Sequence, residues 1–306
     1  MPQSQRDVRN RIGAVKNIQK ITRAMEMVAA ARLRRAEQRI EALRPYANAI
    51  RRMTRQAAEA AGSVPRLPIL EEHEQVSKVG LLLIAGDRGL AGAFNSNIVR
   101  AGVAAGREHE SQGRTPVYFA SGRRPATSLT FRGLEPAESF TGFTDRPSYA
   151  DARRIAERAM AGYVDGEVDR VEIFYNGYVS PVTQIVRRET LLPLQQATVL
   201  EEESDESEAE GQAQHTSEHR ALVEYEPDPE EILKRLVPDY VEISIFRALL
   251  ESTASEHGAR MTAMRNASEN AGELIQTLTL EMNRARQAEI TQEILEVVAG
   301  AEGLSG

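Results

Sequence analysis

The chain has 306 residues, 41% hydrophobic and 27% charged, which is enough apolar material for one or two domains with a buried core. It contains no cysteine, which excludes disulfides, thiolate metal ligands and cysteine nucleophiles. The net charge of −7 conceals an asymmetry: residues 1–60 hold fourteen lysines and arginines against five acids, and the remainder is acidic on balance.

The N-terminal segment predicts one long helix. From 11 to 59, small and apolar residues recur in alternating steps of three and four, as in the seam of a left-handed coiled coil. Polar and alanine positions in this seam indicate a partner that approaches closely or moves against the helix. Pro45 predicts a kink, and the sequence at 62–65 predicts a stop. The seam positions are Ile12, Val15, Gln19, Thr22, Glu26, Ala29, Leu33, Ala36, Ile40, Leu43, Ala47, Ile50, Thr54 and Ala57.

The middle of the chain alternates between strand and helix patterns. We predict strands at 79–85, 116–120, 170–175 and 182–192, and helices at 95–110 and 149–163. The last two strands are expected to form a hairpin that turns at Asn176-Gly177. This order predicts a small open α/β sheet.

A glycine turn follows the first predicted strand. Gly86, Gly89 and Gly92 could mark a phosphate-binding turn, but they do not form the spacing GxGxxG. We therefore interpret them as a tight strand-to-helix turn that Asp87 and Arg88 fix. His215 and His219 lie four apart in a segment with no helical pattern, and no other catalytic motif is found. The sequence predicts no catalytic, cofactor-binding or metal-binding residue.

The C-terminal segment predicts a second long helix. Residues 201–228 are strongly acidic and predict a mobile loop, and from 240 to 299 no proline occurs. Sixty helical residues would span about 90 Å, so we expect the two end helices to wrap around each other. The alternative is that each folds separately onto the middle domain. The apolar stripe of this helix comprises Met264, Ala267, Ala271, Leu274, Leu278, Met282 and Ala285.

The predicted fold class is α/β plus a long coiled coil: an antiparallel coiled coil of the N- and C-terminal helices with an inserted small, open, Rossmann-like α/β domain. The expected parts are a helix at 1–62, the α/β domain at 76–195, an acidic flexible loop at 196–230 and a helix at 231–306.

Several runs resemble one family. The run VKNIQKITRAMEMVAA at 15–30 resembles the first helix of the gamma subunit of F-type ATP synthases. The runs NASENAGELI at 266–275 and NRARQAEITQE at 283–293 are similar to that family's last helix, and DRGL at 87–90 and YEPDP at 225–229 also look like family segments. The resemblance covers nearly the whole chain.

The resemblance implies a central rotor shaft that is not itself catalytic. Its expected partners are the hexameric ring of alpha and beta subunits, the epsilon subunit and the ring of membrane proteolipid subunits, with one copy per complex and no nucleic acid. Because the family motif starts so close to residue 1, a bacterial enzyme on the cytoplasmic side of the cell membrane is expected, with the chain as a peripheral component.

The resemblance also implies which residues contact the partners. Arg32 and Arg35 share one face with Arg39 and suit the acidic loop of the beta subunits, although a merely solvated face is the alternative. Met25 is expected on the same side, or else as a plain apolar neighbour of the seam. The tip at 297–304 is expected in an apolar bearing. On the last helix, the expected contacts are Arg286, Gln287, Thr291 and Glu293.

Two rival functions are weaker. A coiled-coil protein that binds nucleic acid would use the basic helix, and a dinucleotide-dependent enzyme would use the middle domain. Neither accounts for long helices at both ends.

Overall fold

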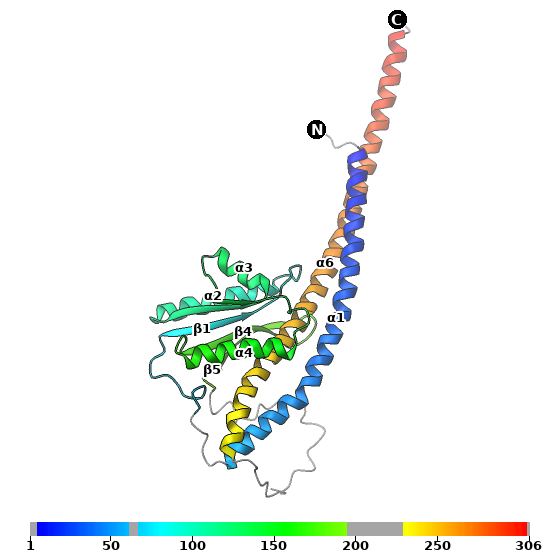
Figure 1. The fold of residues 1–306 in the computed structure, drawn as a ribbon. Coiled ribbons are helices and arrows are strands. Elements are labelled where there is room, and N and C mark those ends of the chain that lie inside the picture. Colours follow the sequence, from blue (N-terminus) through cyan, green and yellow to red (C-terminus); the bar gives the residue numbers. More distant parts are fainter. Residues whose placement is uncertain (1–4, 61–66, 195–228, 305–306) are drawn as a thin grey trace.

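The computed structural model describes residues 5–60, 67–194 and 229–304. Two long helices, α1 (Gln5–Ala60) and α6 (Pro229–Leu304), lie side by side as a rod, and a small sheet domain packs beside one end of it (Figure 1). The predicted acidic loop, the predicted stop at 62–65 and the histidines at 215 and 219 lie outside the described residues.

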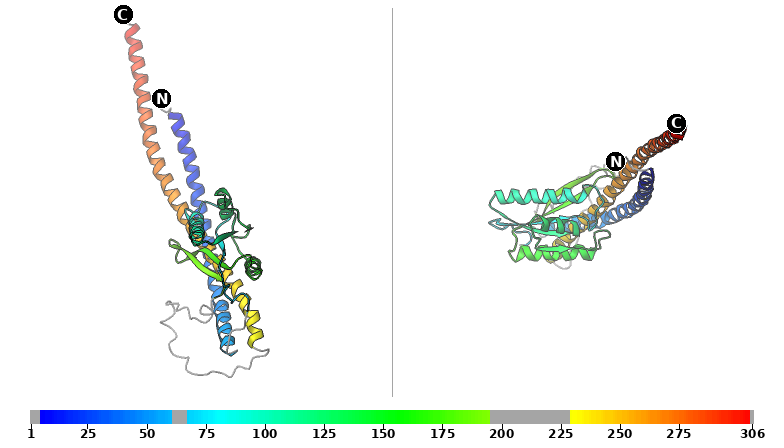
Figure 2. Two further views of the ribbon diagram at one scale, coloured as in Figure 1. Left: turned by 90° about the vertical axis from the view of Figure 1, so that its left-hand side faces the viewer. Right: turned by 90° about the horizontal axis from the view of Figure 1, so that it is seen from above.

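The two helices run antiparallel. Val8, Ile12 and Val15 near the start of α1 pack with Ala271 and Leu278 of α6. Farther along α1, Leu33 and Ala36 pack with Ala254, and Ile50 packs with Leu236 and Ile243. Rising numbers in α1 thus meet falling numbers in α6, which confirms the predicted antiparallel pair. Figure 2 shows that α6 continues past the first turn of α1 as a single helix.

The predicted seam of α1 faces inward along its whole length. Each of its fourteen positions is buried or half-buried, including the polar residues Gln19, Thr22 and Glu26. Gln19 donates through Nε2 to the carbonyl of Ser268 at 3.2 Å, and Glu26 pairs with Arg265 at 2.9 Å. Gln19 and Glu26 therefore have partners on α6, while the Thr22 hydroxyl donates to the carbonyl of Gln19 in its own helix. The apolar stripe predicted for α6 is wrong at Leu274. This side chain is 39% exposed, and its neighbour Ile275 packs against α1 instead.

The inserted domain is a five-stranded sheet in the order β3-β2-β1-β4-β5. Strands β1 (Lys78–Ile84), β2 (Thr115–Ser121), β3 (Glu138–Phe140) and β4 (Arg170–Tyr178) are parallel, and β5 (Gln184–Leu192) pairs antiparallel with β4. Helices α2 (Phe94–Ser111) and α3 (Arg123–Phe131) accompany one face, and α4 (Tyr149–Val164) covers the other (Figure 1).

Helix α6 also belongs to the core of the inserted domain. Val237, Val241 and Ile245 pack in one cluster with Leu82 and Ile173 of the sheet. The helix begins at Pro229 and continues through Pro238. The lost backbone hydrogen bond is outweighed, because residues on both sides of Pro238 are buried against the sheet and α1.

The hairpin turn is also displaced from its predicted place. Asn176 and Gly177 lie inside β4, and the chain turns at 179–183 instead, where Ser180 and Thr183 exchange backbone hydrogen bonds. Asn176 is buried, donates through Nδ2 to the carbonyl of Phe94 and accepts at its own carbonyl from Ser255 of α6. These contacts outweigh the local turn preference of the Asn-Gly pair. Helix α3 and the short strand β3 were missed by the sequence prediction.

Candidate functional site

The distal end of α6 has no covering from the described part of the chain. Figure 1 shows this end of the helix extending away from the inserted domain. Every residue from 286 to 299 is exposed, and this stretch includes large apolar side chains. Their exposed fractions run from 48% for Ile290 to 72% for Val297, with Ile294, Leu295 and Val298 between them. At 3.6 residues per turn they cover an arc of about 160° of the helix. A surface of this kind is typical of a segment that another protein encloses.

Four predicted contact residues lie on this bare segment. Arg286, Gln287, Thr291 and Glu293 are all exposed. Thr291 donates through its hydroxyl to the carbonyl of Gln287, one turn earlier, at 2.9 Å. The tip predicted at 297–304 continues the same helix to Leu304. These side chains are free to meet a partner, and none is placed for chemistry within the chain.

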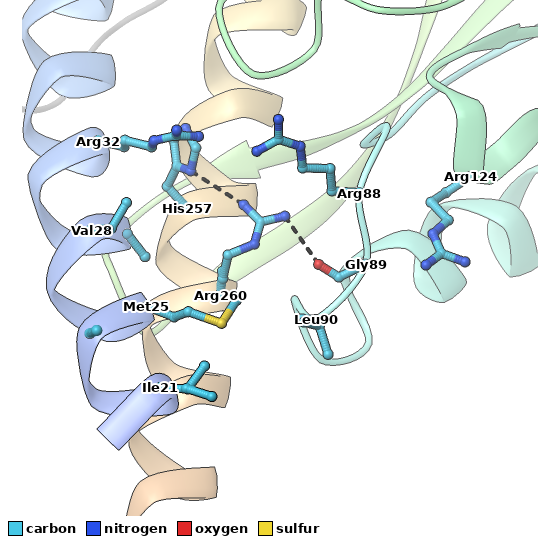
Figure 3. Close-up of a pocket in the computed structure, with 12 residues that line it drawn as sticks. Ile21, Met25, Val28, Arg32, Arg88, Gly89, Leu90, Arg124, His257 and Arg260 are labelled. Atoms are coloured by element: carbon cyan, nitrogen blue, oxygen red, sulfur yellow. Dashed lines mark hydrogen bonds between the residues drawn. The ribbon is translucent and has the colours of Figure 1, made fainter. Parts of the chain in front are cut away.

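Met25 lies in a second region, where α1, α6 and the glycine turn meet. A pocket of about 470 Å³ opens here, lined on α1 by Ile21, Met25 and Val28 and on the other side by Leu90 and Arg260. Figure 3 shows Met25 and Arg260 facing each other across the gap between the two helices. Its apolar walls and basic rim suit an acidic segment with apolar neighbours. The pocket lies about 40 Å along α6 from Gln287, so the predicted contact residues fall into two groups.

Two of the three arginines on the predicted face of α1 contact the inserted domain, and the third is exposed. Arg32 binds Asp145 of the inserted domain, Nη1 to Oδ1 at 2.6 Å, and Arg39 donates to the carbonyl of Pro147. Burial, followed by repulsion from Arg146, lowers the pKa of Arg39. Arg35 is exposed beside them. Of the arginines on this face of α1, Arg35 is the one that the structure leaves exposed.

The glycine turn is occupied by contacts from the chain itself. The Asp87 carboxylate accepts from the backbone N–H groups of Arg123 and Gly142 at 2.9 Å each and from the Thr144 hydroxyl at 3.0 Å. A β-carbon on Gly86 would lie 2.8 Å from the Glu256 carboxylate of α6. Asp87 therefore fixes the turn as predicted. Arg88 contributes its carbonyl, which accepts from Asn95, while its side chain is exposed at the pocket (Figure 3).

A buried charged group on α6 was missed by sequence reasoning. Glu256, His257 and Arg260 are all less than a tenth exposed. Glu256 and Arg260 form an ion pair one turn apart, and Arg260 also donates to the carbonyl of Gly89 at 3.2 Å. Burial raises the pKa of Glu256, and Arg260 opposes that rise. Burial, together with repulsion from Arg260, lowers the pKa of His257 to about 4. The available signal was the pair Glu256 and Arg260 at i, i+4 within a stretch of small residues.

Two negative findings hold for the described ranges 5–60, 67–194 and 229–304. No group of three or more His, Asp or Glu side chains is arranged to hold a metal ion. No helix in these ranges combines the length and apolar character needed to span a bilayer.

Comparisons with known proteins agree over almost the full chain. A family model described as ATP synthase matches residues 4–304. The ATP synthase gamma chain of Rubrobacter xylanophilus is 43% identical over 302 residues, which are 99% of each chain. The gamma chain of Moorella thermoacetica is 42% identical over 98% of each chain.

Solved structures have the same architecture. A chain in the central stalk and c-ring of the mitochondrial ATP synthase of Tetrahymena thermophila matches with a TM-score of 0.58 at 25% identity, covering 81% of this chain and 99% of that one. A chain of the Euglena gracilis mitochondrial ATP synthase matches with a TM-score of 0.63 at 19% identity, covering 98% and 94%. The chain therefore belongs to the family of ATP synthase gamma chains.

Proposed function

We propose that this chain is the central rotating shaft of a bacterial ATP synthase and carries no catalytic site of its own. The shaft turns inside a ring of alpha and beta subunits, while the inserted domain joins an epsilon subunit and a ring of membrane proteolipid subunits. Rotation driven by proton flow then presents different sides of the shaft to the catalytic beta subunits in turn.

The bare segment of α6 at 286–299 carries this proposal. An isolated helix is marginal in water, and apolar side chains such as Ile294 and Leu295 gain from burial. An enclosing sleeve of other proteins supplies that burial. The exposed surface of α1 supports the same assignment, because Ile18, Ile21 and Met27 are each more than half exposed.

The charge of the shaft suits a contact that must break and re-form. Exposed ion pairs contribute about 0–1 kcal/mol each and can be exchanged as one surface moves past another. The face that includes Arg35 therefore offers attraction to acidic segments of the ring without locking the shaft. The chain is accordingly a peripheral component on the cytoplasmic side of the cell membrane, held there by the proteolipid ring.

The decisive experiment is to observe rotation directly. Ser111 is exposed at the end of α2, and Ser111→Cys gives this cysteine-free chain a single thiol for a bead. With the alpha and beta ring fixed to a surface, ATP is expected to drive continuous rotation of the bead. A bead attached to a ring subunit is the stationary control. A bead that stays motionless on a complex that hydrolyses ATP would rule out the proposed role of this chain as a rotating shaft.

The non-catalytic part of the proposal has its own test. The isolated chain is expected to neither bind nor hydrolyse ATP, whereas the assembled complex hydrolyses it. The Asp87 carboxylate at the glycine turn already accepts hydrogen bonds from Gly142 and Thr144. ATP turnover by the isolated chain that Asp87→Asn abolishes would contradict this part.

A further inference from the structure

The loop between β3 and α4 contacts both long helices at the same level. Toward α1, Asp145 binds Arg32 and the carbonyl of Pro147 accepts from Arg39. Toward α6, the carbonyl of Thr144 accepts from the Thr253 hydroxyl at 2.9 Å. Residues 141–147, which we call the joint, therefore connect the inserted domain to both helices.

His257 brings the two sides of the joint together. Its Nε2 lies 3.7 Å from Asp145 Oδ1. Figure 3 shows Arg32 and His257 approaching each other from α1 and α6. The Asp145 carboxylate thus lies against a basic side chain of each helix, Arg32 of α1 and His257 of α6.

The joint is itself held firmly to the sheet. Asp87, which follows β1, accepts from the backbone N–H groups of Gly142 and Thr144 at 2.9 and 3.3 Å. The backbone N–H of Asp87 donates in return to the Thr144 hydroxyl at 2.8 Å. Gly142 has φ of 95°, a conformation that glycine permits and side chains disfavour. A rotation of the sheet therefore moves the joint with it.

The two helices differ in how they are attached to the inserted domain. Helix α6 contributes Val241 and Ile245 to the domain core, whereas α1 contributes no residue to either core cluster of the sheet. Beyond Arg32 and Arg39, α1 reaches the domain through Glu37, which accepts from the Tyr178 hydroxyl, and through apolar contacts with two tyrosine rings. Torque on the inserted domain is therefore transmitted to α6 through the packed core. Its direct transmission to α1 depends on polar cross-links such as those of Arg32 and Arg39.

We propose that the joint transmits torque from the inserted domain to both helices of the shaft at once, with Asp145 as its positioning residue. Twisting two parallel rods makes them slide along each other unless they are linked, and the alanine-rich seam between α1 and α6 resists sliding weakly. The joint links them at Arg32 and His257. This inference rests on the proposed function as a rotating shaft.

The test compares Asp145→Asn with Glu135→Gln in assembled ATP synthase. Glu135 is an exposed acid in the neighbouring turn and serves as the matched control. The bead on Ser111→Cys is stalled with a non-hydrolysable nucleotide, and its angular fluctuations report the torsional stiffness. We expect wider fluctuations for Asp145→Asn, unchanged fluctuations for Glu135→Gln, and a lower ratio of protons pumped to ATP hydrolysed for Asp145→Asn alone. Since Asp145 is half-exposed, we expect the amplitude of the angular fluctuations to change by at most roughly fivefold.

A second variant examines the other side of the joint. Thr253→Val removes the hydrogen bond to Thr144 and is expected to widen the fluctuations in the same direction. Fluctuations identical to those of Glu135→Gln in both variants would overturn the proposal, as would failure of the Asp145→Asn chain to assemble, since Asp145 would then act in folding. The proposed function fails separately, if the unmodified complex does not rotate.

Discussion

Two stretches of α6 have opposite environments in one continuous helix. Between 241 and 260, the buried stretch, every residue is buried or half-buried, against the sheet on one side and α1 on the other. Between 286 and 299, the bare stretch, every residue is exposed, although Ile290 and Ile294 are as apolar as Ile243 and Ile245. The chain itself covers the buried stretch. The described part of the chain leaves the apolar side chains of the bare stretch uncovered, which favours a partner from another protein.

Matched isoleucine substitutions in the buried and bare stretches of α6 give the largest expected contrast in stability. Ile245 is fully buried, so Ile245→Ala should lower the free energy of unfolding of the isolated chain by about 2–5 kcal/mol through loss of apolar contact and a cavity. Urea denaturation followed by circular dichroism measures this change.

The control for that substitution lies in the same helix. Ile294 is 57% exposed, so Ile294→Ala should change the unfolding free energy of the isolated chain by no more than about 0.5 kcal/mol. It should instead weaken binding to the alpha and beta ring. Equal destabilisation of the isolated chain by the two variants would contradict the distinction between the buried and the bare stretch.

Deletion of 297–306 extends the same comparison to the end of the chain. The melting of the inserted domain should not change, because the described residues of this tip contact nothing in the domain. Binding to the ring should weaken by roughly tenfold or more, since burial of one valine side chain stabilises by about 1.5–3 kcal/mol. Titration of the ring with each chain measures the affinity, and a large loss of domain stability would contradict the division.

His257 makes the stability of the buried stretch of α6 sensitive to pH. Its pKa is lowered to about 4 in the folded chain, so the unfolded chain binds the extra proton below pH 6.5. Stability is therefore complete above pH 6.5 and declines as pH falls toward 4, by about 2 kcal/mol between pH 7 and pH 5. His257→Gln should remove that part of the slope. Denaturation of both chains at the two pH values gives the difference, and identical slopes would show that His257 is not the source.

Arg35→Gln should have the smallest effect. Arg35 is exposed, so its loss should leave the isolated chain as stable as before. Binding to the ring should weaken by about 0–1 kcal/mol, and the loss should shrink at high salt. Arg100→Gln on the exposed side of α2 is the control. An equal loss of binding from both variants would point to general charge rather than to a contact at Arg35.

Periodicity predicted the architecture because burial follows it closely. All fourteen positions that the alternation of three and four residues picked out on α1 are buried or half-buried, since one face of a regular helix meets one partner along its length. The strand and helix pattern likewise predicted four of the five strands and two of the three helices of the inserted domain that precede α6. The 3-residue strand β3 is too short to show a pattern.

Tertiary contacts account for the wrong predictions. Asn176-Gly177 has the sequence of a turn but lies in a strand, because the Arg187 side chain covers Gly177 and α6 binds the carbonyl of Asn176. Glu256 and His257 are polar yet buried, because Gly86 of the glycine turn packs closely against Glu256 and Asp145 of the joint lies beside His257. Pairings of this kind join residues far apart in sequence, and a single sequence carries no record of them.

The length of α6 sets the angle between the inserted domain and the tip. The helix runs for 76 residues without a loop, so no hinge separates Arg260 from Arg286. Each residue advances a helix by about 100°, so one residue inserted between them would turn the apolar side of the tip by that amount relative to the sheet. An insertion of seven residues would nearly restore the original orientation, leaving an offset of about 20°. The number of residues in this segment therefore encodes an angular phase as well as a distance.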